Sequence, residues 1–336
     1  MSSVTPFVSS HVRSIIESLR LLESFVTAPL GLYSDIKMVR EAMPFPEAAE
    51  LTRDETSERR TAFMTLTKQP LELALKTISV TSESLDALGS TRGEGGSSLS
   101  PEWVSRARRV LARAHQRVTG EMRAATAAGI RGLYVIVDPE ATNGRPVLEV
   151  AEAALKGGTR VLQLRDKSHD KAEVLSSARD AKSLCDRHGA LFIMNDHADL
   201  ALSSDAHGLH VGQSDLPVAE ARRVLAPRQV LGRSNNSVDE ALESQSQGAD
   251  YLAVGAVFPT ATMGKSDRTS IGVEMVAKIK EMVDRPVVAI GGISAENVAD
   301  VVRAGADCVC VVSGVTLAVD PEAAAADLVD KIESAT

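Results

Sequence analysis

Short apolar runs alternate with helix-length segments from residue 130 to the end of the chain. The segments between the runs are rich in Ala, Leu, Glu and Arg, and several end near a glycine. The runs cover residues 132–137, 160–164, 190–194, 208–211, 229–232, 251–254, 286–290 and 308–312. Strands with almost no polar residues are typical of parallel sheets, because helices cover both faces of such sheets. The pattern therefore predicts an α/β domain of strand–helix units.

Eight such units within about 200 residues predict a compact TIM (β/α)8 barrel, which we assign to residues 129–336. An open, doubly wound sheet is the alternative. No GxGxxG motif follows the first run, which weakens the dinucleotide-binding form of that alternative. In a barrel the carboxyl ends of all strands converge on one face, where the active sites of barrel enzymes lie. Polar residues that directly follow the runs are therefore candidates for a functional site.

Residues 1–128 contain no convincing strand and predict a small all-helical N-terminal domain, whose role the sequence does not reveal. Apolar residues recur at helical spacing, for example within residues 12–26. Residues 89–100, GSTRGEGGSSLS, have the composition of a flexible loop. Ser100 and Pro101 then provide an N-cap and a first helical position. The arginines of this helix, at positions 106, 108, 109, 113 and 117, indicate a solvated helix face more than a binding face.

Composition limits the partners of the chain. The net charge of −8 argues against general nucleic-acid binding, and the 3% of aromatic residues disfavours modules that stack on bases. No run approaches the roughly 18 apolar residues of a membrane span. The first residues lack the pattern of a signal peptide, and the three cysteines show no metal-ligand spacing. We therefore expect a cytoplasmic protein with reduced thiols that acts on small molecules, and a homo-oligomer is left open.

The second run leads into QLRDK, a motif that indicates a phosphate site. Gln163, Arg165 and Lys167 alternate and therefore point to the same side as the chain leaves the strand. An arginine binds phosphate oxygens through two parallel N–H groups, and a lysine adds a point charge. The alternative is a surface ion-pair patch that includes Asp166.

Carboxylates follow the third and fourth runs. The third ends in Asn195 and Asp196, and the fourth leads to Gln213 and Asp215. Two carboxylates from neighbouring strands, close to a cationic phosphate site, indicate Mg²⁺, because this ion takes oxygen ligands and often bridges protein and phosphate. The alternative is helix N-capping, a common role of aspartate.

Three histidines near these runs, His197, His207 and His210, raise the alternative of a transition-metal site. They do not form the HxxxH pair that places two ligands on one helix face. His210 also falls inside a predicted strand. A transition-metal site is therefore disfavoured.

The later runs lead to hydroxyl and glycine residues that suit a phosphate. Ser234 follows the fifth run, and Thr260, Thr262 and Lys265 follow the sixth. The seventh run ends in AIGGIS and the eighth in VCVVSGV, where glycines and Ser313 allow backbone N–H groups to approach an anion. TIM barrels commonly bind phosphate after these last two strands.

Seven motifs, taken in chain order, resemble the thiamine-phosphate synthase family. They are QLRDK, NDHADLA, GLHVGQSDL, GRSNNS, DYLAVGAVFPTAT, AIGGIS and GADCVCVVSGV. Any one of them is a weak signal, but all seven in order at the ends of predicted strands are specific. The resemblance covers residues 130–335 and none of the first 128 residues.

The resemblance implies a transferase that joins an aminopyrimidine diphosphate to a thiazole phosphate and releases diphosphate, by a Mg²⁺-assisted dissociative displacement. It implies that the pyrimidine substrate is held by Gln163, Arg165, Lys167, Asn195 and Ser234. It implies that the thiazole phosphate is held by Thr260, Thr262, Gly292, Val312 and Ser313. The implied Mg²⁺ ligands are Asp196 and Asp215. The implied catalytic cations, which stabilise the departing diphosphate, are Arg165, Lys167 and Lys265.

The chain departs from the family pattern after the second threonine, where a lysine normally follows directly. Here the order is TATMGK, so Lys265 reaches the diphosphate if the loop bulges at Gly264. Two alternative functions remain, a thiazole tautomerase-like isomerase and a non-catalytic, phosphate-responsive regulatory barrel. Asn235 and Asn236 stand near the place where the tautomerase uses a histidine. The complete set of cationic and carboxylate residues argues against the regulatory barrel.

Overall fold

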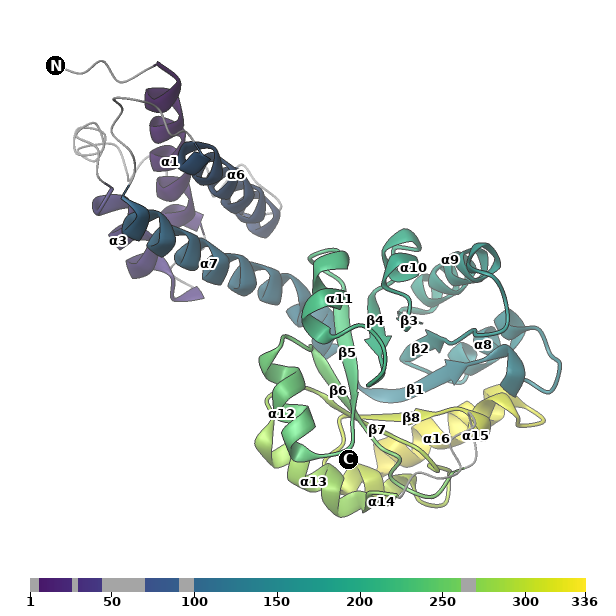
Figure 1. Cartoon of the computed structure of the whole chain (residues 1–336). Helices are drawn as coiled ribbons and strands as arrows, with labels where there is room; N and C mark the ends of the chain where they lie inside the picture. Colours follow the sequence, from purple (N-terminus) through teal and green to yellow (C-terminus); the bar gives the residue numbers. More distant parts are fainter. Residues whose placement is uncertain (1–5, 26–29, 44–69, 91–99, 261–269) are drawn as a thin grey trace. The chain divides into compact units, whose positions relative to one another are not determined.

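The computed structural model describes residues 6–25, 30–43, 70–90, 100–260 and 270–336. The chain divides into two compact units, Met1–Met122 and Arg123–Thr336. Helices and strands of both units are drawn in Figure 1. The elements described in the N-terminal unit are all helices, and every strand of the described residues belongs to the C-terminal unit.

The N-terminal unit consists of helices that bury one aliphatic face. They are α1 (Pro6–Phe25), α3 (Tyr33–Glu41), α6 (Pro70–Ser90) and the larger part of α7 (Pro101–Ala128). Its almost fully buried side chains include Ile15, Leu19, Leu22, Leu85 and Leu111. A buried ion pair between Arg40 Nε and Glu23 Oε1, 2.5 Å apart, joins α3 to α1. The helical character predicted for this region is confirmed.

The start of α7 agrees with its sequence signals. Ser100 Oγ accepts a hydrogen bond from the backbone N–H of Trp103 at 3.2 Å, and Pro101 is the first helical residue. The loop was predicted from residue 89, but α6 continues to Ser90, so the first two residues of that prediction are helical. Residues 91–99 of that loop lie outside the described residues.

The arginine-rich face of α7 is solvated. Arg108 and Arg113 have 55% and 61% of their side chains exposed and pair with Asp86 and Asp35. Exposed ion pairs contribute little to stability. This arrangement supports the solvated face rather than a binding face.

The C-terminal unit is a closed barrel of eight parallel strands. The strands are β1 (Gly132–Val137), β2 (Val161–Leu164), β3 (Leu191–Asn195), β4 (Gly208–Val211), β5 (Val230–Asn235), β6 (Tyr251–Val254), β7 (Val287–Ile290) and β8 (Cys308–Val311). The helices are α8 (Val147–Lys156), α9 (Lys171–His188), α10 (Ala198–Ser203), α11 (Val218–Val224), α12 (Val238–Ser246), α13 (Gly272–Met282), α14 (Val298–Arg303), α15 (Ser313–Thr316) and α16 (Pro321–Ala335), with a 3₁₀ turn, η1 (Pro139–Ala141). Closure confirms the predicted TIM barrel and excludes the open, doubly wound sheet.

Each predicted run overlaps one strand, and the largest difference between a run and its strand lies in β5. The apolar run ends at Gly232, but β5 continues for three polar residues to Asn235. Its ladder with β6 continues through the pair Asn235 and Val254. Backbone pairing, which does not depend on side-chain polarity, therefore extends the strand beyond its apolar run.

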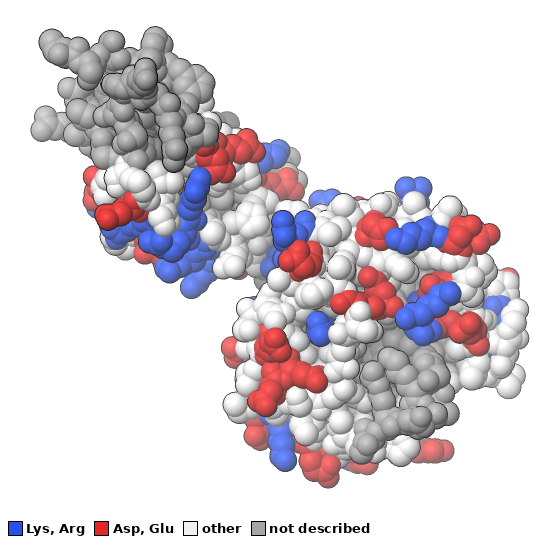
Figure 2. Space-filling view, viewed as in Figure 1, with Lys and Arg blue, Asp and Glu red and all other residues white. Residues whose placement is uncertain are grey.

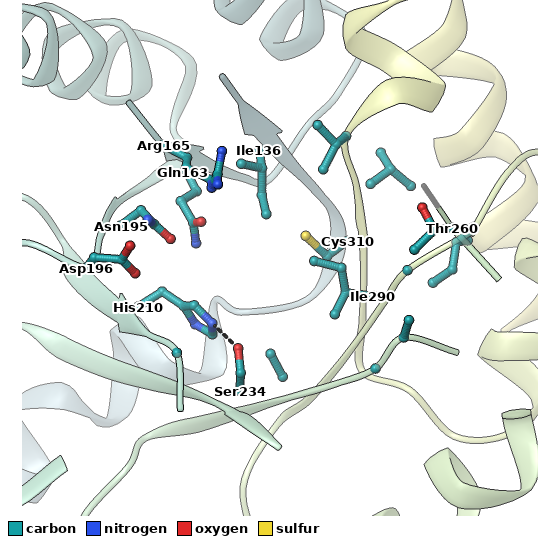
Figure 3. Close-up of a pocket in the computed structure, with 18 of the residues that line it drawn as sticks. Ile136, Gln163, Arg165, Asn195, Asp196, His210, Ser234, Thr260, Ile290 and Cys310 are labelled. Carbon is teal, nitrogen blue, oxygen red and sulfur yellow. Dashed lines mark hydrogen bonds between the residues drawn. The ribbon is translucent and has the colours of Figure 1, made fainter. Parts of the chain in front are cut away.

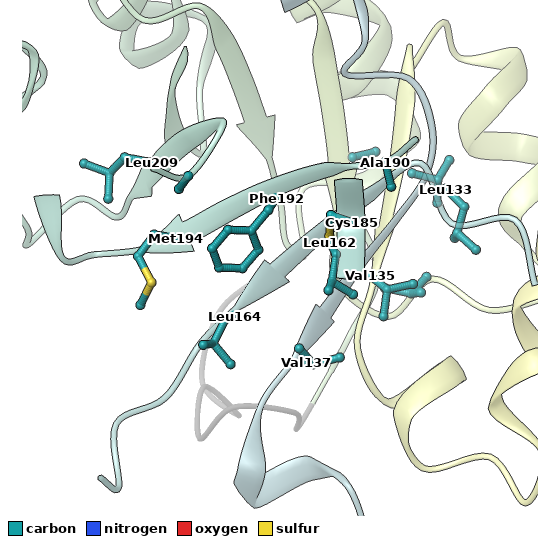
Figure 4. Close-up of a cluster of buried hydrophobic side chains, with 14 of the residues drawn as sticks. Leu133, Val135, Val137, Leu162, Leu164, Cys185, Ala190, Phe192, Met194 and Leu209 are labelled. Carbon is teal, nitrogen blue, oxygen red and sulfur yellow. The ribbon is translucent and has the colours of Figure 1, made fainter. Parts of the chain in front are cut away.

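Alternate residues of each strand face either the barrel interior or the helices. Val135 packs outward in a buried cluster that includes Leu162 and Phe192, and Figure 4 draws these side chains with others of the cluster. Tyr134 and Ile136 belong to a separate interior cluster. The three cysteines are buried and unpaired. The inward and outward sets together fill both sides of the strands, as expected for a barrel that is packed rather than hollow.

A buried ion pair joins the end of α7 to the strands of the barrel unit. Arg123 Nε donates to Asp250 Oδ1 at 3.0 Å, and both side chains are about nine-tenths buried. Asp250 also accepts from the backbone N–H of Leu231 at 2.9 Å and pairs with Arg222. Ile130, just beyond α7, lies in the interior cluster. The barrel unit therefore includes Arg123, which precedes the predicted boundary at 129.

We expect a fragment of residues 119–336 to fold and to be more stable than a fragment of residues 125–336. The shorter fragment lacks Arg123, so buried Asp250 loses one of its two cations, at a cost of about 1–3 kcal/mol. Urea denaturation of both fragments measures the difference. The matched control is Arg123→Ala in the longer fragment, which should lose a similar amount. Equal midpoints for the two fragments would contradict the role of this ion pair.

Candidate active site

A cavity of about 430 Å³ lies at the carboxyl ends of the strands. Among the residues that line it are eleven predicted from the sequence: Gln163, Arg165, Lys167, Asn195, Asp196, Asp215, Ser234, Thr260, Gly292, Val312 and Ser313. Thr262 and Lys265 lie outside the described residues. Figure 3 shows polar side chains on one side of the cavity, and Ile136, Ile290 and Cys310 lie across from them. The labelled polar side chains are Gln163, Arg165, Asn195, Asp196, His210 and Ser234. Segments far apart in the sequence thus meet in one concave site.

The cationic part of the cavity follows β2. Arg165 forms an ion pair with Asp138, which directly follows β1 and is 2% exposed. Lys167 Nζ lies 3.0 Å from Asp196 Oδ2. Arg165 and Lys167 do not form a surface ion-pair patch with Asp166. Asp166 instead accepts hydrogen bonds from Ser168 and from the backbone N–H of His169 in the same loop. Arg165 and Lys167 therefore face the cavity, each held by a carboxylate.

The two predicted metal ligands lie together. Asp215 Oδ2 accepts the backbone N–H of Gly212 at 2.7 Å. Burial, and secondly the neighbouring carboxyl of Asp196, raise the pKa of Asp215. Neither residue is a helix cap, since His197 and Pro217 occupy the N-cap positions of α10 and α11. A carboxylate pair whose charges disfavour each other is a suitable place for a cation.

The residues present fit Mg²⁺ better than a transition metal. Within the described ranges, no cluster of three or more His, Cys, Asp or Glu side chains is arranged to hold a metal. Mg²⁺ usually keeps several waters and binds through one or two carboxylates and substrate phosphates. Asp196 and Asp215 meet that requirement, and the nearby cations would contact the same phosphates.

The opposite end of the cavity presents backbone and hydroxyl groups. Gly292 has a φ of +66°, and a Cβ there would lie 2.6 Å from the carbonyl oxygen of Pro259. Glycine is therefore required at this point, because a side chain would collide with Phe258 and Pro259, which precede Thr260. Val312 and Ser313, at the junction of β8 and α15, complete this end of the cavity.

The sequence interpretation missed three side chains that support the site, Asp138, Tyr134 and Tyr251, and it named His210 only as a disfavoured transition-metal ligand. Asp138, like Asp196, is a carboxylate that directly follows a strand. No recognised motif at the end of the first run pointed to it. His210 lines the cavity although it lies inside β4. Its neighbour Leu209 packs outward, so the alternation of the strand turns His210 inward. Tyr134 and Tyr251 are also inward-facing, and this alternation is the signal that finds all three.

Comparison with known proteins shows the family. A family model described as thiamine monophosphate synthase matches residues 133–315. The chain belongs to this family. The resemblance predicted from the seven motifs is therefore confirmed. The match lies within the barrel unit and leaves the N-terminal helices outside it.

Individual relatives agree with the family model. The thiamine-phosphate synthase of Shouchella clausii is 44% identical over 205 residues, which are 61% of this chain and 97% of the relative. That of Thioalkalivibrio sulfidiphilus is 45% identical over 209 residues, 62% of this chain and 98% of the relative. A solved structure of thiamine phosphate pyrophosphorylase from Pyrococcus furiosus is 37% identical, covers 62% of this chain and 98% of its own, and has a TM-score of 0.58.

We expect Asp215→Asn to leave the free energy of unfolding unchanged or higher at pH 7 without metal. The folded-state pKa of Asp215 is raised, by burial first, so ionisation of this carboxyl weakens the fold as the pH rises above the unfolded value. Any gain over wild type should therefore shrink as the pH falls toward about 4. Urea denaturation in the presence of a chelator, at both pH values, measures this.

The control for this variant is a carboxylate that does cap a helix. Asp170 accepts hydrogen bonds from the backbone N–H groups of Ala172 and Glu173 at the start of α9. Asp170→Ala should cost roughly 0.5–2 kcal/mol. A loss of that size for Asp215→Asn would mean that Asp215 is structural.

Proposed function

We propose that the chain is a thiamine-phosphate synthase, which joins an aminopyrimidine diphosphate to a thiazole phosphate and releases diphosphate. The observation that carries this proposal is the convergence of every described candidate residue on one cavity of a barrel of this family. The named relatives do not favour the thiazole tautomerase or the regulatory barrel. Asn235, which stands near the tautomerase histidine, is buried and accepts a hydrogen bond from Ser244, so it has a structural role.

The pyrimidine substrate would occupy the polar side of the cavity. Arg165 and Lys167 would bind the oxygens of its diphosphate, with Asn195 beside them. The pairing of Arg165 with buried Asp138 holds the guanidinium at the edge of the cavity before substrate arrives. Gln163 and Ser234 would contact the pyrimidine. Preorganised charges of this kind stabilise a transition state without reorganising during the reaction.

Asp196 and Asp215 would hold Mg²⁺ next to these cations. When bound there, Mg²⁺ supplies counter-charge to the diphosphate. Lys167, which contacts Asp196 at 3.0 Å, would position that carboxylate and add a second positive charge. Lys265 would contribute a further cation, and its role stays a prediction.

The reaction needs charge stabilisation and positioning rather than a base. The bond between the methylene carbon and the diphosphate oxygen breaks, and its electron pair leaves with the diphosphate. The electron-rich aminopyrimidine carries the resulting cation until the lone pair of the thiazole nitrogen forms the new C–N bond. That nitrogen has no proton to lose. The apolar side of the cavity, which includes Ile136 and Ile290, would exclude water from the cation.

The thiazole phosphate would bind at the other end of the cavity. Thr260, Gly292, Val312 and Ser313 line that end, and Thr262 is assigned with them from the sequence. Holding both substrates in line makes the second step effectively unimolecular, which is a major source of rate.

The cellular setting is proposed from the sequence. No helix among the described residues is long and apolar enough to cross a membrane. A cytoplasmic location stays a prediction, and so does any assembly of identical chains. Small-molecule substrates follow from the family, and the role of the N-terminal helices is not assigned.

The decisive experiment supplies the purified chain with both substrates and Mg²⁺. We expect equal amounts of thiamine phosphate and diphosphate to form, and no reaction when either substrate is omitted. Isomerisation of the thiazole without use of the pyrimidine would indicate the tautomerase instead. Absence of any turnover would overturn the proposal.

Replacing either carboxylate should change the Mg²⁺ dependence of the rate. Asp196→Asn and Asp215→Asn each remove an anionic oxygen ligand from a hard cation. Turnover should fall at least about 100-fold, equivalent to nearly 3 kcal/mol of transition-state stabilisation, and half-maximal rate should need more Mg²⁺. A Mg²⁺ titration of each variant measures both effects. Wild-type rates at wild-type Mg²⁺ concentrations would remove these residues from the metal site.

A negative charge at the end of the cavity that includes Ser313 should weaken binding of the thiazole phosphate. Ser313→Asp places a carboxylate where we assign the thiazole phosphate, and like charges repel. We expect the KM for thiazole phosphate to rise at least about tenfold, or 1.4 kcal/mol, with little change in the pyrimidine KM. Ser313→Ala is the control, because it removes the hydroxyl without adding charge. Equal effects on both KM values would contradict the placement.

A further inference from the structure

Five side chains form a continuous hydrogen-bonded chain beneath the cavity. Gln163 Nε2 donates to Tyr134 Oη at 2.6 Å, and Tyr134 Oη lies 3.3 Å from Tyr251 Oη. Tyr251 Oη lies 3.2 Å from His210 Nδ1, and His210 Nε2 lies 3.0 Å from Ser234 Oγ. The last of these bonds is drawn in Figure 3. Gln163, His210 and Ser234 line the cavity, whereas the tyrosines that connect them are buried below it.

A glycine makes this connection possible. His210, Gly232 and Tyr251 are paired in register on three neighbouring strands, β4, β5 and β6. A Cβ on Gly232 would lie 2.0 Å from the Tyr251 ring. The ring therefore occupies the space that any other side chain would fill. Tyr251 can in this way reach across β5 and stack on His210, with ring centroids 5.7 Å apart.

The groups in the chain fix the direction of its hydrogen bonds. An amide nitrogen only donates, so Tyr134 Oη accepts from Gln163. Burial raises the pKa of Tyr134 and of Tyr251, so both keep their hydrogens. Within the described residues, the remaining hydrogen-bond partner of Tyr134 is Tyr251, so Tyr134 donates to Tyr251, which in turn donates to His210 Nδ1.

The direction continues from His210 into the cavity. A neutral imidazole that accepts at Nδ1 carries its hydrogen on Nε2 and donates to Ser234 Oγ. The hydroxyl hydrogen of Ser234 is then left to donate to a ligand. If the hydrogen bond between the tyrosines ran the other way, Tyr134 Oη would accept from both Gln163 and Tyr251. Its buried hydroxyl hydrogen would then lack an acceptor among the described residues, which is unfavourable.

We infer that Tyr134, Tyr251 and His210 are positioning residues that select the aminopyrimidine by fixing a donor at Ser234 and an acceptor at Gln163. The inference rests on the proposed function and goes beyond it, since the two tyrosines do not line the cavity. With Nε2 of Gln163 engaged, its Oε1 is the atom that can accept from the ligand. An aminopyrimidine offers the matching pair, an amino donor and an unprotonated ring-nitrogen acceptor. Its 4-oxo analogue offers the reverse pair, a carbonyl acceptor and a ring N–H donor.

The variant that tests this series of hydrogen bonds is Tyr251→Phe. It keeps the ring over Gly232 and removes the hydrogen bond that holds Nδ1 of His210 as an acceptor. The other tautomer then becomes available, with Ser234 donating to His210 and offering a lone pair to the ligand. Selection between the two pyrimidines should weaken, because a site that hydrogen-bonds its substrate rejects a mismatched analogue strongly.

The measurement is the ratio of the Ki of the 4-oxo diphosphate, as a competitive inhibitor, to the KM of the aminopyrimidine diphosphate. We expect Tyr251→Phe to lower this ratio at least about tenfold, the scale of one hydrogen bond, and to leave the thiazole phosphate KM unchanged. Tyr33→Phe, in the N-terminal unit, is the matched control and should change neither. An unchanged ratio in Tyr251→Phe would overturn the inference.

Two further measurements do not depend on the stability of that variant. Gly232→Ala displaces the Tyr251 ring without altering a polar group, and it should lower the same ratio. Long-range proton–nitrogen NMR of the full chain reports the tautomer of His210, whose signals are identified by their loss in His210→Gln. We expect the hydrogen on Nε2.

The outcomes separate this inference from the proposed function. Hydrogen on Nδ1 of His210 in the wild-type chain would overturn the inference even if turnover is normal. Absence of wild-type turnover would overturn the proposed function, and the NMR measurement would still decide the tautomer.

Discussion

The continuous hydrogen-bond ladder that closes eight parallel strands is the constraint on which the cavity depends. β1 pairs with both β2 and β8, so the eight strands of the barrel have no free edge. Closure brings the ends of all strands to one face, and it divides the residues of each strand between an interior and a helix-covered exterior. The first effect gathers the charged residues that follow the strands. The second places Tyr134 and Tyr251, which lie within strands, directly beneath them.

The charges around the cavity are arranged in alternating pairs. Asp138 holds Arg165, Lys167 contacts Asp196, and Asp196 adjoins Asp215. Each cation is therefore near a carboxylate, which limits the cost of gathering like charges at one rim. The negative charges of a polyanionic ligand would pair with Arg165 and Lys167, and a cation bound to that ligand would pair with Asp196 and Asp215. That requirement connects the geometry with a diphosphate substrate.

Much of the fold and of the site was predictable because two simple signals coincide. Apolar runs located the strands, and polar residues at their ends located Arg165, Asp196 and Ser313. The end of β5 was missed because backbone pairing extends past the apolar run. Asp138 was missed, and His210 was named only as a disfavoured metal ligand, because their roles depend on which strands become neighbours and on which way a strand residue faces. Residues 261–269, with Thr262 and Lys265, stay as predicted from sequence alone.

Polar residues inside a barrel are costly unless every hydrogen bond is made, and this cost gives the buried chain its specificity. Tyr134 and Tyr251 are each at most 1% exposed, so water cannot readily replace a lost partner. Reversing one hydrogen bond would require reversing the whole series from Gln163 to Ser234. The donor and acceptor offered to a ligand are thus coupled through groups that do not line the cavity. Gly232 makes the coupling possible by having no side chain, so a residue with no polar side-chain atom helps determine which heterocycle the site accepts.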